Sequence, residues 1–148
     1  MPARAERDYS GTPLHRKLGI GAGAVVAFLD APEVFSERLG ALPDGVEVRR
    51  QARGALDVIV LFVTERSRLV ARFGAAERAM VPDGGLWVAW PKQRFWMATD
   101  LDFAGVQQVG FEAGLVDNKS CAIDESWQAL RFVVRRADRP ARMRAAAR

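Results

Sequence analysis

The chain has 148 residues, of which 49% are hydrophobic, and a formal net charge of +4. This length suits one domain with a sizeable core and is too short for two full domains. One cysteine and one histidine exclude an intramolecular disulfide and leave too few ligands for a structural zinc site. The lone cysteine, the absence of a signal-peptide pattern and the absence of a membrane-length apolar run predict a cytoplasmic protein without a membrane partner.

Positive charge is concentrated near the C-terminus. Residues 131–148 hold seven arginines and one aspartate, whereas residues 18–130 hold eleven basic and fifteen acidic residues. We therefore expect a flexible N-terminus at 1–8, a single domain at 9–136 whose main part, 18–130, is mildly acidic, and a basic flexible tail at 137–148. The tail arginines could bind nucleic acid non-specifically, but no aromatic or groove-reading element accompanies them, which favours a solvated tail; they are Arg139, Arg142, Arg144 and Arg148.

The first half of the chain alternates strand and helix patterns. Residues 12–18 predict a short helix that begins at Thr12-Pro13 and places His15 on the surface. The apolar run 24–29 predicts a buried strand, and 32–39 predicts a helix capped by Asp30. Residues 46–48 predict a short strand near a sheet edge.

The most hydrophobic run, 57–63, predicts a central strand, followed by a helix that Thr64 caps and that extends to residue 80. In residues 82–92, a diglycine turn should precede a strand apolar on both faces, with Leu86, Val88 and Trp90 on one face and Trp87 and Ala89 on the other. Such strands lie inside parallel sheets covered by helices. Pro91 ends the strand.

The last elements are a helix and a hairpin. Thr99-Asp100 reads as a helix N-cap, with Asp102 as the second acid of a capping box and Gly114 after the helix. Residues 115–123 and 127–135 predict an antiparallel pair joined at Asp124-Glu125. This order predicts an α/β fold: a three-layer, Rossmann-like, mostly parallel sheet with a C-terminal antiparallel hairpin. The layout resembles a class I methyltransferase that lacks one strand-helix unit.

Several separate blocks resemble a family of small bacterial proteins known as domain of unknown function 3052. The matching blocks are YSGTPL at 9–14, KLGI at 17–20, PDGGLWVAWPK at 82–92, GLVDNK at 114–119 and CAIDE at 121–125, followed by Trp127, Leu130, Arg131, Phe132 and Val133. The resemblance covers about residues 9–136 and implies no assigned activity, cofactor or catalytic residue. Phe95-Trp96-Met97 departs from the small residues that we expect in relatives.

The residues around the first strand disfavour S-adenosylmethionine. A methyltransferase-like site needs glycines after that strand, and here Asp30-Ala31-Pro32-Glu33 follows it. The end of the second strand should carry an acid for the ribose hydroxyls, and Arg49-Arg50 stands there. Asp30 and Glu33 would also repel a phosphate at the helix start. We therefore expect no cofactor and no metal.

Polar residues at the carboxyl ends of the strands are the remaining site candidates. In one hypothesis Lys92 binds an acidic group or ligand in a cleft, with Asp124 or Glu125 as base. The cleft would also hold Asp30, Thr64, Glu65, Asp100 and Trp127. In the alternative, Asp30, Thr64 and Asp100 cap helices, Asp124-Glu125 forms a turn, and Lys92 forms an ion pair; this interpretation is favoured because each residue then has a local role.

Three further features leave alternatives open. Asp117-Asn118-Lys119 lies in an alternating strand and could face a partner, although exposed polar residues are ordinary there. Cys121 is expected to be a small core residue rather than a nucleophile. The Phe95-Trp96-Met97 loop could be a lid, an oligomer contact or part of the core.

Three functions compete. The leading hypothesis is a non-catalytic binding or interaction module, which could form a homodimer through the hairpin or the aromatic loop. The second is an enzyme or ligand-binding protein that uses S-adenosylmethionine or a nucleotide in a modified cleft between the first and third strands. The third is nucleic-acid association through the arginine tail.

Overall fold

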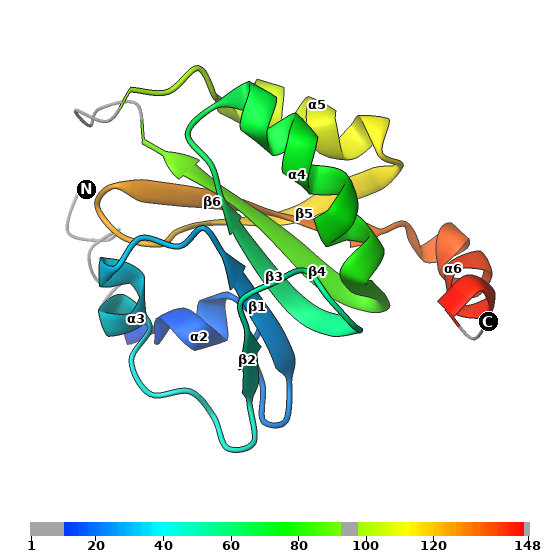
Figure 1. Cartoon of the computed structure of the whole chain (residues 1–148), viewed down its shortest axis with the longest axis horizontal. Helices are drawn as coiled ribbons and strands as arrows, with labels where there is room; N and C mark the ends of the chain where they lie inside the picture. Colours follow the sequence, from blue (N-terminus) through cyan, green and yellow to red (C-terminus); the bar gives the residue numbers. More distant parts are fainter. Residues whose placement is uncertain (1–10, 93–97, 147–148) are drawn as a thin grey trace.

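The computed structural model describes residues 11–92 and 98–146 and contains a six-stranded mixed sheet (Figure 1). The strand order is β2-β1-β3-β4-β6-β5. The pairs β1–β2, β1–β3 and β3–β4 are parallel, and β6 runs antiparallel to both β4 and β5. The strands are β1 (Val25–Leu29), β2 (Glu47–Arg49), β3 (Leu56–Phe62), β4 (Met80–Pro91), β5 (Leu115–Ala122) and β6 (Trp127–Val134).

Helices cover both faces of the sheet, so the molecule has three layers (Figure 1). Leu14 of α2, Leu18 directly after it, and Phe35 and Leu39 of α3 belong to one apolar cluster. Residues of α4 and α5 belong to the cluster on the other face. The helices are α2 (Leu14–Lys17), α3 (Val34–Leu39), α4 (Arg66–Ala79) and α5 (Phe103–Glu112).

Strand β4 lies between the two apolar clusters, as the alternation of its residues predicts. Leu86, Val88 and Trp90 are buried in the cluster under α4 and α5, whereas Trp87 and Ala89 are buried in the cluster under α2 and α3. The central position of β1, β3 and β4 follows from their doubly apolar character, because a strand buried on both faces cannot occupy a solvated edge. The predicted Rossmann-like, methyltransferase-like fold with its C-terminal hairpin is confirmed.

The diglycine pair does not form the turn that the sequence predicts. Gly84 and Gly85 both lie within β4, which already begins at Met80. The β3–β4 register shifts here, between Leu56 and Val58. A Cβ on Gly84 would lie only 2.8 Å from the carbonyl oxygen of Asp57. Gly84 therefore serves close packing of β4 on β3 rather than chain reversal, and a Cβ on Gly85 would meet the Arg131 side chain of β6.

The β5–β6 hairpin places β5 at one sheet edge and β6 against β4. Asn118, Lys119 and Ser120 are exposed on β5, and its register shifts between Asp117 and Lys119. A lysine and an irregularity on an edge strand both hinder pairing with another chain. A homodimer through this hairpin stays a prediction.

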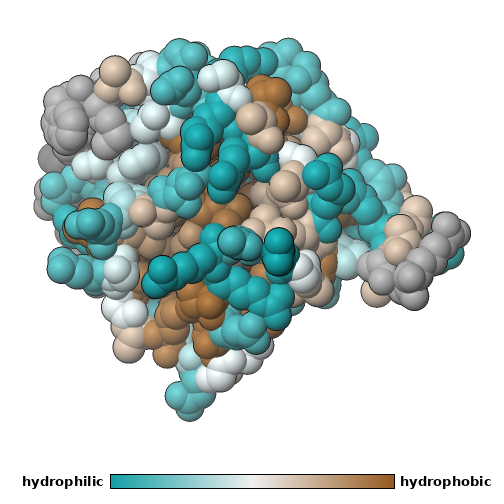
Figure 2. All heavy atoms as spheres, in the orientation of Figure 1, coloured by the Kyte–Doolittle hydropathy of each residue, from teal (hydrophilic) through white to brown (hydrophobic). Residues whose placement is uncertain are grey.

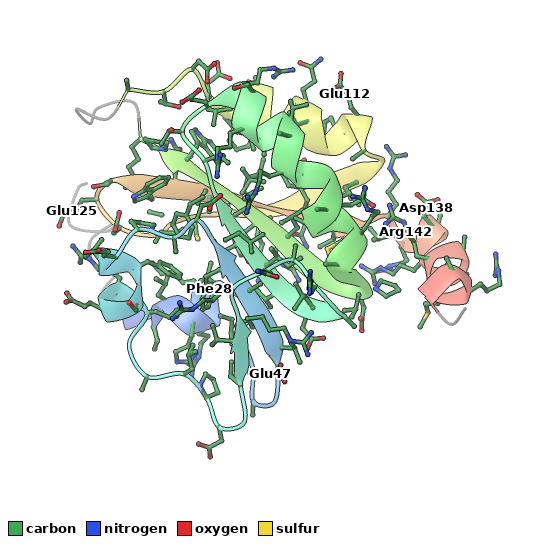
Figure 3. The ribbon with its side chains drawn as sticks, in the orientation of Figure 1. Phe28, Glu47, Glu112, Glu125, Asp138 and Arg142 are labelled. Carbon is green, nitrogen blue, oxygen red and sulfur yellow. The ribbon has the colours of Figure 1, made fainter. Side chains whose placement is uncertain are left out.

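The C-terminal segment differs from the flexible tail that its composition predicts. Arg136–Asp138 form a 3-10 turn, and α6 spans Arg139–Ala146. Arg142 donates to the Glu77 carboxylate at 2.7 Å, which ties α6 to α4, although the helix projects from the body of the molecule (Figure 1). Figure 3 shows Arg142 at the end of the molecule opposite Glu125. A count of charges cannot identify Glu77 as a partner 65 positions away, and the flexibility of residues 137–148 stays a prediction.

Some sequence predictions lie outside the described residues. These are the flexible N-terminus at 1–8 and the loop Phe95-Trp96-Met97. Among the helices in the described part of the chain, none has the length and apolar character needed to cross a membrane.

Candidate functional site: the crevice at the ends of β1 and β2

The turn after β1 is built around Asp30. Its φ angle is 58°, in the left-handed region that few residues other than glycine adopt. Its carboxylate oxygen Oδ2 lies 3.3 Å from Arg68 and 3.4 Å from Arg72, both on α4. Asp30 does not cap α3, since that helix begins at Val34 after Glu33 without a side-chain cap. The carboxylate therefore faces α4, on the opposite side of the sheet from α3.

Three of the candidate site residues, Thr64, Glu65 and Asp100, lie together at the start of α4. Their contacts there are structural. Thr64 does not cap the helix; the N-cap residue is Glu65, and its side chain makes no capping bond. The cap comes from Asp100, which accepts the Arg66 N–H at 2.7 Å. The Thr64 carbonyl accepts the Thr99 hydroxyl at 2.7 Å. Asp100 thus caps α4, and the cap of α5 is Asp102, which accepts the Gly105 N–H.

The two residues proposed as the base, Asp124 and Glu125, lie in the β5–β6 turn. Asp124 Oδ1 accepts the N–H groups of Ser126 and Trp127 at 2.8 and 2.9 Å, so it stabilises the turn. Glu125 is exposed and 4.0 Å from Arg38 of α3. Lys92 lies next to this turn, because its N–H donates to the Ser126 carbonyl at 2.8 Å. The structure brings Lys92 and Asp124 into one region, but the Asp124 carboxylate already accepts two backbone bonds.

Trp127, a cleft candidate from the sequence, is instead a core residue, with 7% of its surface exposed. Its ring packs edge-on against Phe62 at 5.1 Å, Phe62 packs against Phe35, and Phe35 packs against Phe28. This row of rings fills the layer between the sheet and α3. Large aromatic side chains gain most from such burial, which explains why Trp127 is not available to a ligand.

A pocket of about 680 Å³ lies on the α3 side of the β1 and β2 carboxyl ends. We call it the α3-side pocket. Its apolar wall includes Phe28, Pro32 and Val48, and Val48 keeps 49% of its surface exposed; Figure 3 shows Phe28 on this side of the sheet. Of the predicted cleft residues, only Asp30 lines it, together with Glu33, Arg49 and Arg50. Ligands of open α/β sheets bind at this edge.

A second pocket of about 390 Å³ lies on the α4 side of the same edge, and we call it the α4-side pocket. Arg50, Arg53 and Arg72 line it, with Gln51 and four apolar residues. Among the described residues that line it there is no carboxylate. Arg50 lines both pockets, so both border the end of β2. Figure 2 shows strongly hydrophilic surface over this loop and α4, next to hydrophobic surface.

Sequence reasoning missed this cluster. It used Arg49 and Arg50 only as evidence against a ribose-binding acid, and it did not consider Arg53 or Arg72. A signal was present: basic residues follow the second strand, where an acid is the ordinary choice. The link to Arg72 was hidden, because it depends on α4, which packs on β3 and β4, approaching the turn after β1.

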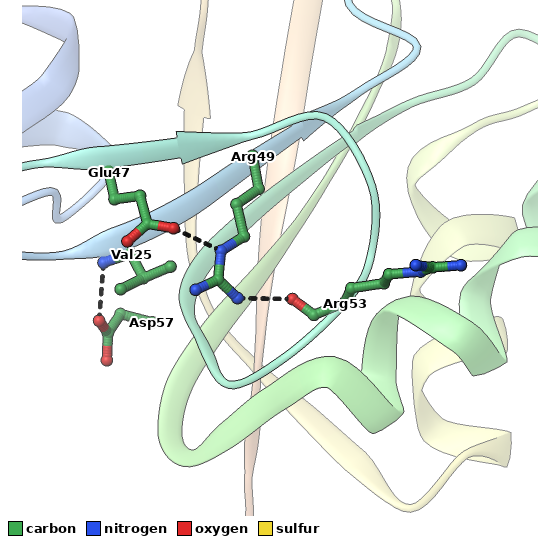
Figure 4. A network of polar contacts seen from close by, with 5 residues as sticks. All are labelled: Val25, Glu47, Arg49, Arg53 and Asp57. Atoms are coloured by element: carbon green, nitrogen blue, oxygen red, sulfur yellow. Dashed lines mark hydrogen bonds and ion pairs between the residues drawn. The ribbon is translucent and has the colours of Figure 1, made fainter.

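The loop after β2 is held in place by Arg49 (Figure 4). Its guanidinium donates to Glu47 and to the Arg53 carbonyl, both at less than 3 Å. A Cβ on Gly54, which has a φ of 80°, would collide with the Arg49 guanidinium. The Arg53 side chain extends away from Arg49 toward α4 (Figure 4). Arg49 thus fixes the loop, and Arg50 and Arg53 are presented to the pockets.

A third pocket, of about 560 Å³, lies near β5 and β6 and is lined by Lys17, Lys92, Lys119 and Cys121 among others. Burial raises the pKa of the Cys121 thiol to about 11, against the opposite effect of Lys17. The thiol is therefore protonated at neutral pH, which agrees with the expectation that it is not a nucleophile.

The remaining candidates have ordinary structural settings. Asp117 accepts the Gln107 side-chain amide of α5 at 3.3 Å, so this residue joins β5 to a helix, while Asn118 and Lys119 are exposed. His15 is half-buried rather than fully at the surface. Across residues 11–92 and 98–146, no group of three or more His, Cys, Asp or Glu side chains could hold a metal ion.

The strand order and the antiparallel β6 define a class I methyltransferase-like fold, and comparison with solved structures supports this. Magnesium protoporphyrin IX methyltransferase from Synechocystis PCC 6803, with bound SAM, superimposes with a TM-score of 0.51 and 10% identity, over 89% of this chain and 78% of that one. A SAM-dependent methyltransferase from Aquifex aeolicus gives 0.51 and 11%, over 89% and 97%. A protein from Bordetella parapertussis described as possibly exported gives 0.55 and 15%, over 89% and 67%.

No protein-family model matches this sequence, and no curated protein matches it at a significant level. The resemblance to domain of unknown function 3052 therefore stays a prediction. At 10–15% identity the structural matches establish the fold alone.

Proposed function

We propose that this protein is a non-catalytic binding module that keeps the methyltransferase-like scaffold and its crevice but not the residues that hold S-adenosylmethionine. The observation that carries the proposal is the turn after β1. Its left-handed residue is Asp30, and the Asp30 carboxylate is bound by Arg68 and Arg72.

The residues around this turn do not fit S-adenosylmethionine. Its sulfonium-bearing methionine part is placed against a glycine-containing turn, where backbone can approach closely, and residues 30–33 contain no glycine. The ribose hydroxyls need an acceptor at the end of the second strand. Arg49 and Arg50 offer only donors there, and the nearest acid, Glu47, is bound to Arg49 at 2.7 Å.

Among the described residues, the candidate acids and the thiol have other roles, and this supports the non-catalytic part of the proposal. Asp124 accepts two backbone bonds, Asp100 caps α4, and the Cys121 thiol is held protonated by a raised pKa. Each acid among the candidates that could transfer a proton either stabilises a local structure or, like Glu125, lies exposed away from the α3-side pocket. General acid–base catalysis requires such a group within hydrogen-bond reach of a bound substrate.

Thermal unfolding of the purified chain with S-adenosylmethionine or S-adenosylhomocysteine tests the proposal. A ligand at a hundred times its dissociation constant adds about 2.7 kcal/mol, which raises the melting temperature of a chain of this size by roughly 5–10 °C. We expect no shift with either compound at millimolar concentration. A melting temperature that rises steadily with S-adenosylmethionine would contradict the proposal.

The second candidate, an enzyme or ligand-binding protein with a modified cofactor cleft, is favoured by one observation: the α3-side pocket keeps about 680 Å³ at the cofactor edge of the fold. Cofactor-sized ligands occupy pockets of this size. A dose-dependent shift with S-adenosylmethionine, followed by methyl transfer to any acceptor, would establish this candidate instead.

A further inference from the structure

We propose that the crevice at the end of β2 binds a phosphorylated ribonucleoside. Its phosphate would be held by Arg50, Arg53 and Arg72 in the α4-side pocket, and its nucleoside would lie against Phe28, Pro32 and Val48 in the α3-side pocket. This inference rests on the proposed function, because it names the ligand class of the same crevice.

The α4-side pocket concentrates positive charge that is only partly compensated, by Asp30. Three arginines line a space of about 390 Å³. Within the described residues, Arg50 and Arg53 make no ion pair, and the only carboxylate bound by Arg72 is that of Asp30. Like charges that converge on one cavity repel one another, and a bound dianion removes that repulsion. Arginine also suits phosphate, since its planar group donates two parallel hydrogen bonds.

The loop is prepared for this role before a ligand arrives. Arg49 binds Glu47 and the Arg53 carbonyl, and the Arg53 N–H donates to the Gln51 carbonyl at 2.9 Å. These bonds are made by backbone groups and by the side chains of Arg49 and Glu47. The guanidinium groups of Arg50 and Arg53 take no part in them, and both residues line the α4-side pocket. A pre-formed loop loses less conformational entropy when a ligand binds.

The position of the arginines specifies where the phosphate sits on the ligand. In dinucleotide-binding folds, an acid after the second strand binds the ribose hydroxyls, and an arginine near this point accommodates a 2′-phosphate instead. Arg50 occupies this point and lines both pockets. A ribose phosphorylated on a secondary hydroxyl therefore places its base in the apolar pocket and its phosphate among the arginines.

The acids near the crevice are consistent with this assignment. Asp30 is already bound by two arginines, and Glu47 by Arg49. Glu33 lines the α3-side pocket and not the α4-side pocket, so it opposes an anion in the former and leaves the latter positive.

Isothermal titration of the full chain with 2′-AMP, 5′-AMP, adenosine and inorganic phosphate tests the inference. We expect 2′-AMP to bind at least tenfold more tightly than adenosine and than inorganic phosphate, with 5′-AMP between them. Affinity should fall as salt concentration rises. Equal binding of 2′-AMP and adenosine would overturn the role of the arginines, and equal binding of 2′-AMP and phosphate would overturn the nucleoside part.

Two variants and a matched control locate the site. Arg50→Gln and Arg53→Gln should each weaken 2′-AMP at least tenfold. Arg78→Gln, an exposed arginine of α4 that lines neither pocket, should leave the affinity unchanged. All three positions are exposed, so the melting temperatures should stay close to that of the parent chain. Loss of binding in all three variants alike would overturn the site.

Two further titrations separate this inference from the proposed function and from nucleic-acid binding. A single-stranded RNA that binds more tightly than 2′-AMP, and through Arg50, would overturn the mononucleotide assignment. If no phosphate compound binds at millimolar concentration, the inference fails. The proposed function fails only if S-adenosylmethionine stabilises the chain in the parallel experiment.

Discussion

Arg72 of α4 forms an ion pair with Asp30, whose Oδ2 atom lies 3.4 Å from Arg72 Nη2. The same arginine lines the α4-side pocket, so Asp30 competes with any anion bound there. We predict that Asp30→Asn strengthens 2′-AMP binding severalfold in isothermal titration. Asparagine tolerates the left-handed backbone of this position. Since the ion pairs are largely exposed, the stability should change by less than about 1 kcal/mol.

The control for this prediction is Glu33→Gln. It removes one negative charge from the same turn, but Glu33 does not line the α4-side pocket. Its effect on affinity should be smaller. Equal gains from the two variants would indicate a general charge effect, and an unchanged affinity in Asp30→Asn would show that Asp30 does not compete for Arg72.

The two buried tryptophans of β4 should respond differently to replacement. Trp87 donates its indole N–H to the Leu18 carbonyl at 3.0 Å, which joins the end of α2 to the sheet. Trp90 Nε1 makes no hydrogen bond with any described residue. Both side chains are 1% exposed. Trp87→Phe leaves a buried carbonyl without a partner. This should destabilise the folded chain by about 1–3 kcal/mol beyond the cost of the lost side-chain volume.

Trp90→Phe loses similar volume and removes an unpaired donor, so it should cost less. Urea denaturation of both variants measures the difference. We expect Trp87→Phe to be the less stable by about 1–3 kcal/mol. Equal stabilities would show that the bond to Leu18 contributes nothing net to holding α2.

The strands were predictable because their signals are local. The runs 24–29, 57–63 and 86–90 are apolar on both faces, and this alone assigns them to the middle of a covered sheet. The hairpin followed from a polar turn between two strand-like segments. The structure places the corresponding strands within about one residue of the expected limits, except that β4 starts earlier, at Met80.

The site was less predictable because its contacts are long-range. Local rules assign Asp100 to the helix that follows it, yet Asp100 caps α4, which begins 34 positions earlier. Asp30 likewise looks like a cap for α3 and instead binds arginines 38 and 42 positions away. In the sequence, a short polar side chain before a helix looks the same whether it caps that helix or binds a residue far away. Only the packing of α4 on β3 and β4 decides which partner is nearer.

Two helical glycines should respond in opposite directions to alanine. Alanine favours a helix by about 1 kcal/mol over glycine. At Gly74 of α4, a Cβ would meet only the mobile end of Arg78, at 3.1 Å. Gly74→Ala should therefore stabilise the chain by about 0.5–1 kcal/mol.

At Gly110 of α5, a Cβ would collide with the ring of Phe132. That ring is fully buried and packs against Phe73 at 5.9 Å, so it has no room to move. Gly110→Ala should destabilise the chain by about 1–3 kcal/mol, because overpacking outweighs the helix preference. Thermal or urea unfolding measures both variants. If Gly110→Ala were as stable as Gly74→Ala, α5 would not be packed this closely on β6.

Cys121 should be slow to react with thiol reagents near neutral pH. Burial raises its pKa to about 11, and the thiolate is the reactive form. The rate of alkylation by iodoacetamide should therefore climb with pH up to about 11 in the folded chain, whereas an unfolded cysteine levels off near its usual pKa of about 8.5.

The same shift makes stability depend on pH. Above about pH 8.5 the unfolded chain loses the thiol proton and the folded chain keeps it, so folding becomes less favourable as the pH rises toward 11. Below pH 8.5 this contribution is fully present. Cys121→Ser lacks the titrating thiol and should lose less stability than the parent between pH 8 and pH 10, measured by urea unfolding at each pH. Identical pH profiles for the two chains, or rapid alkylation of the native protein at pH 7, would show that the thiol is not buried as the structure has it.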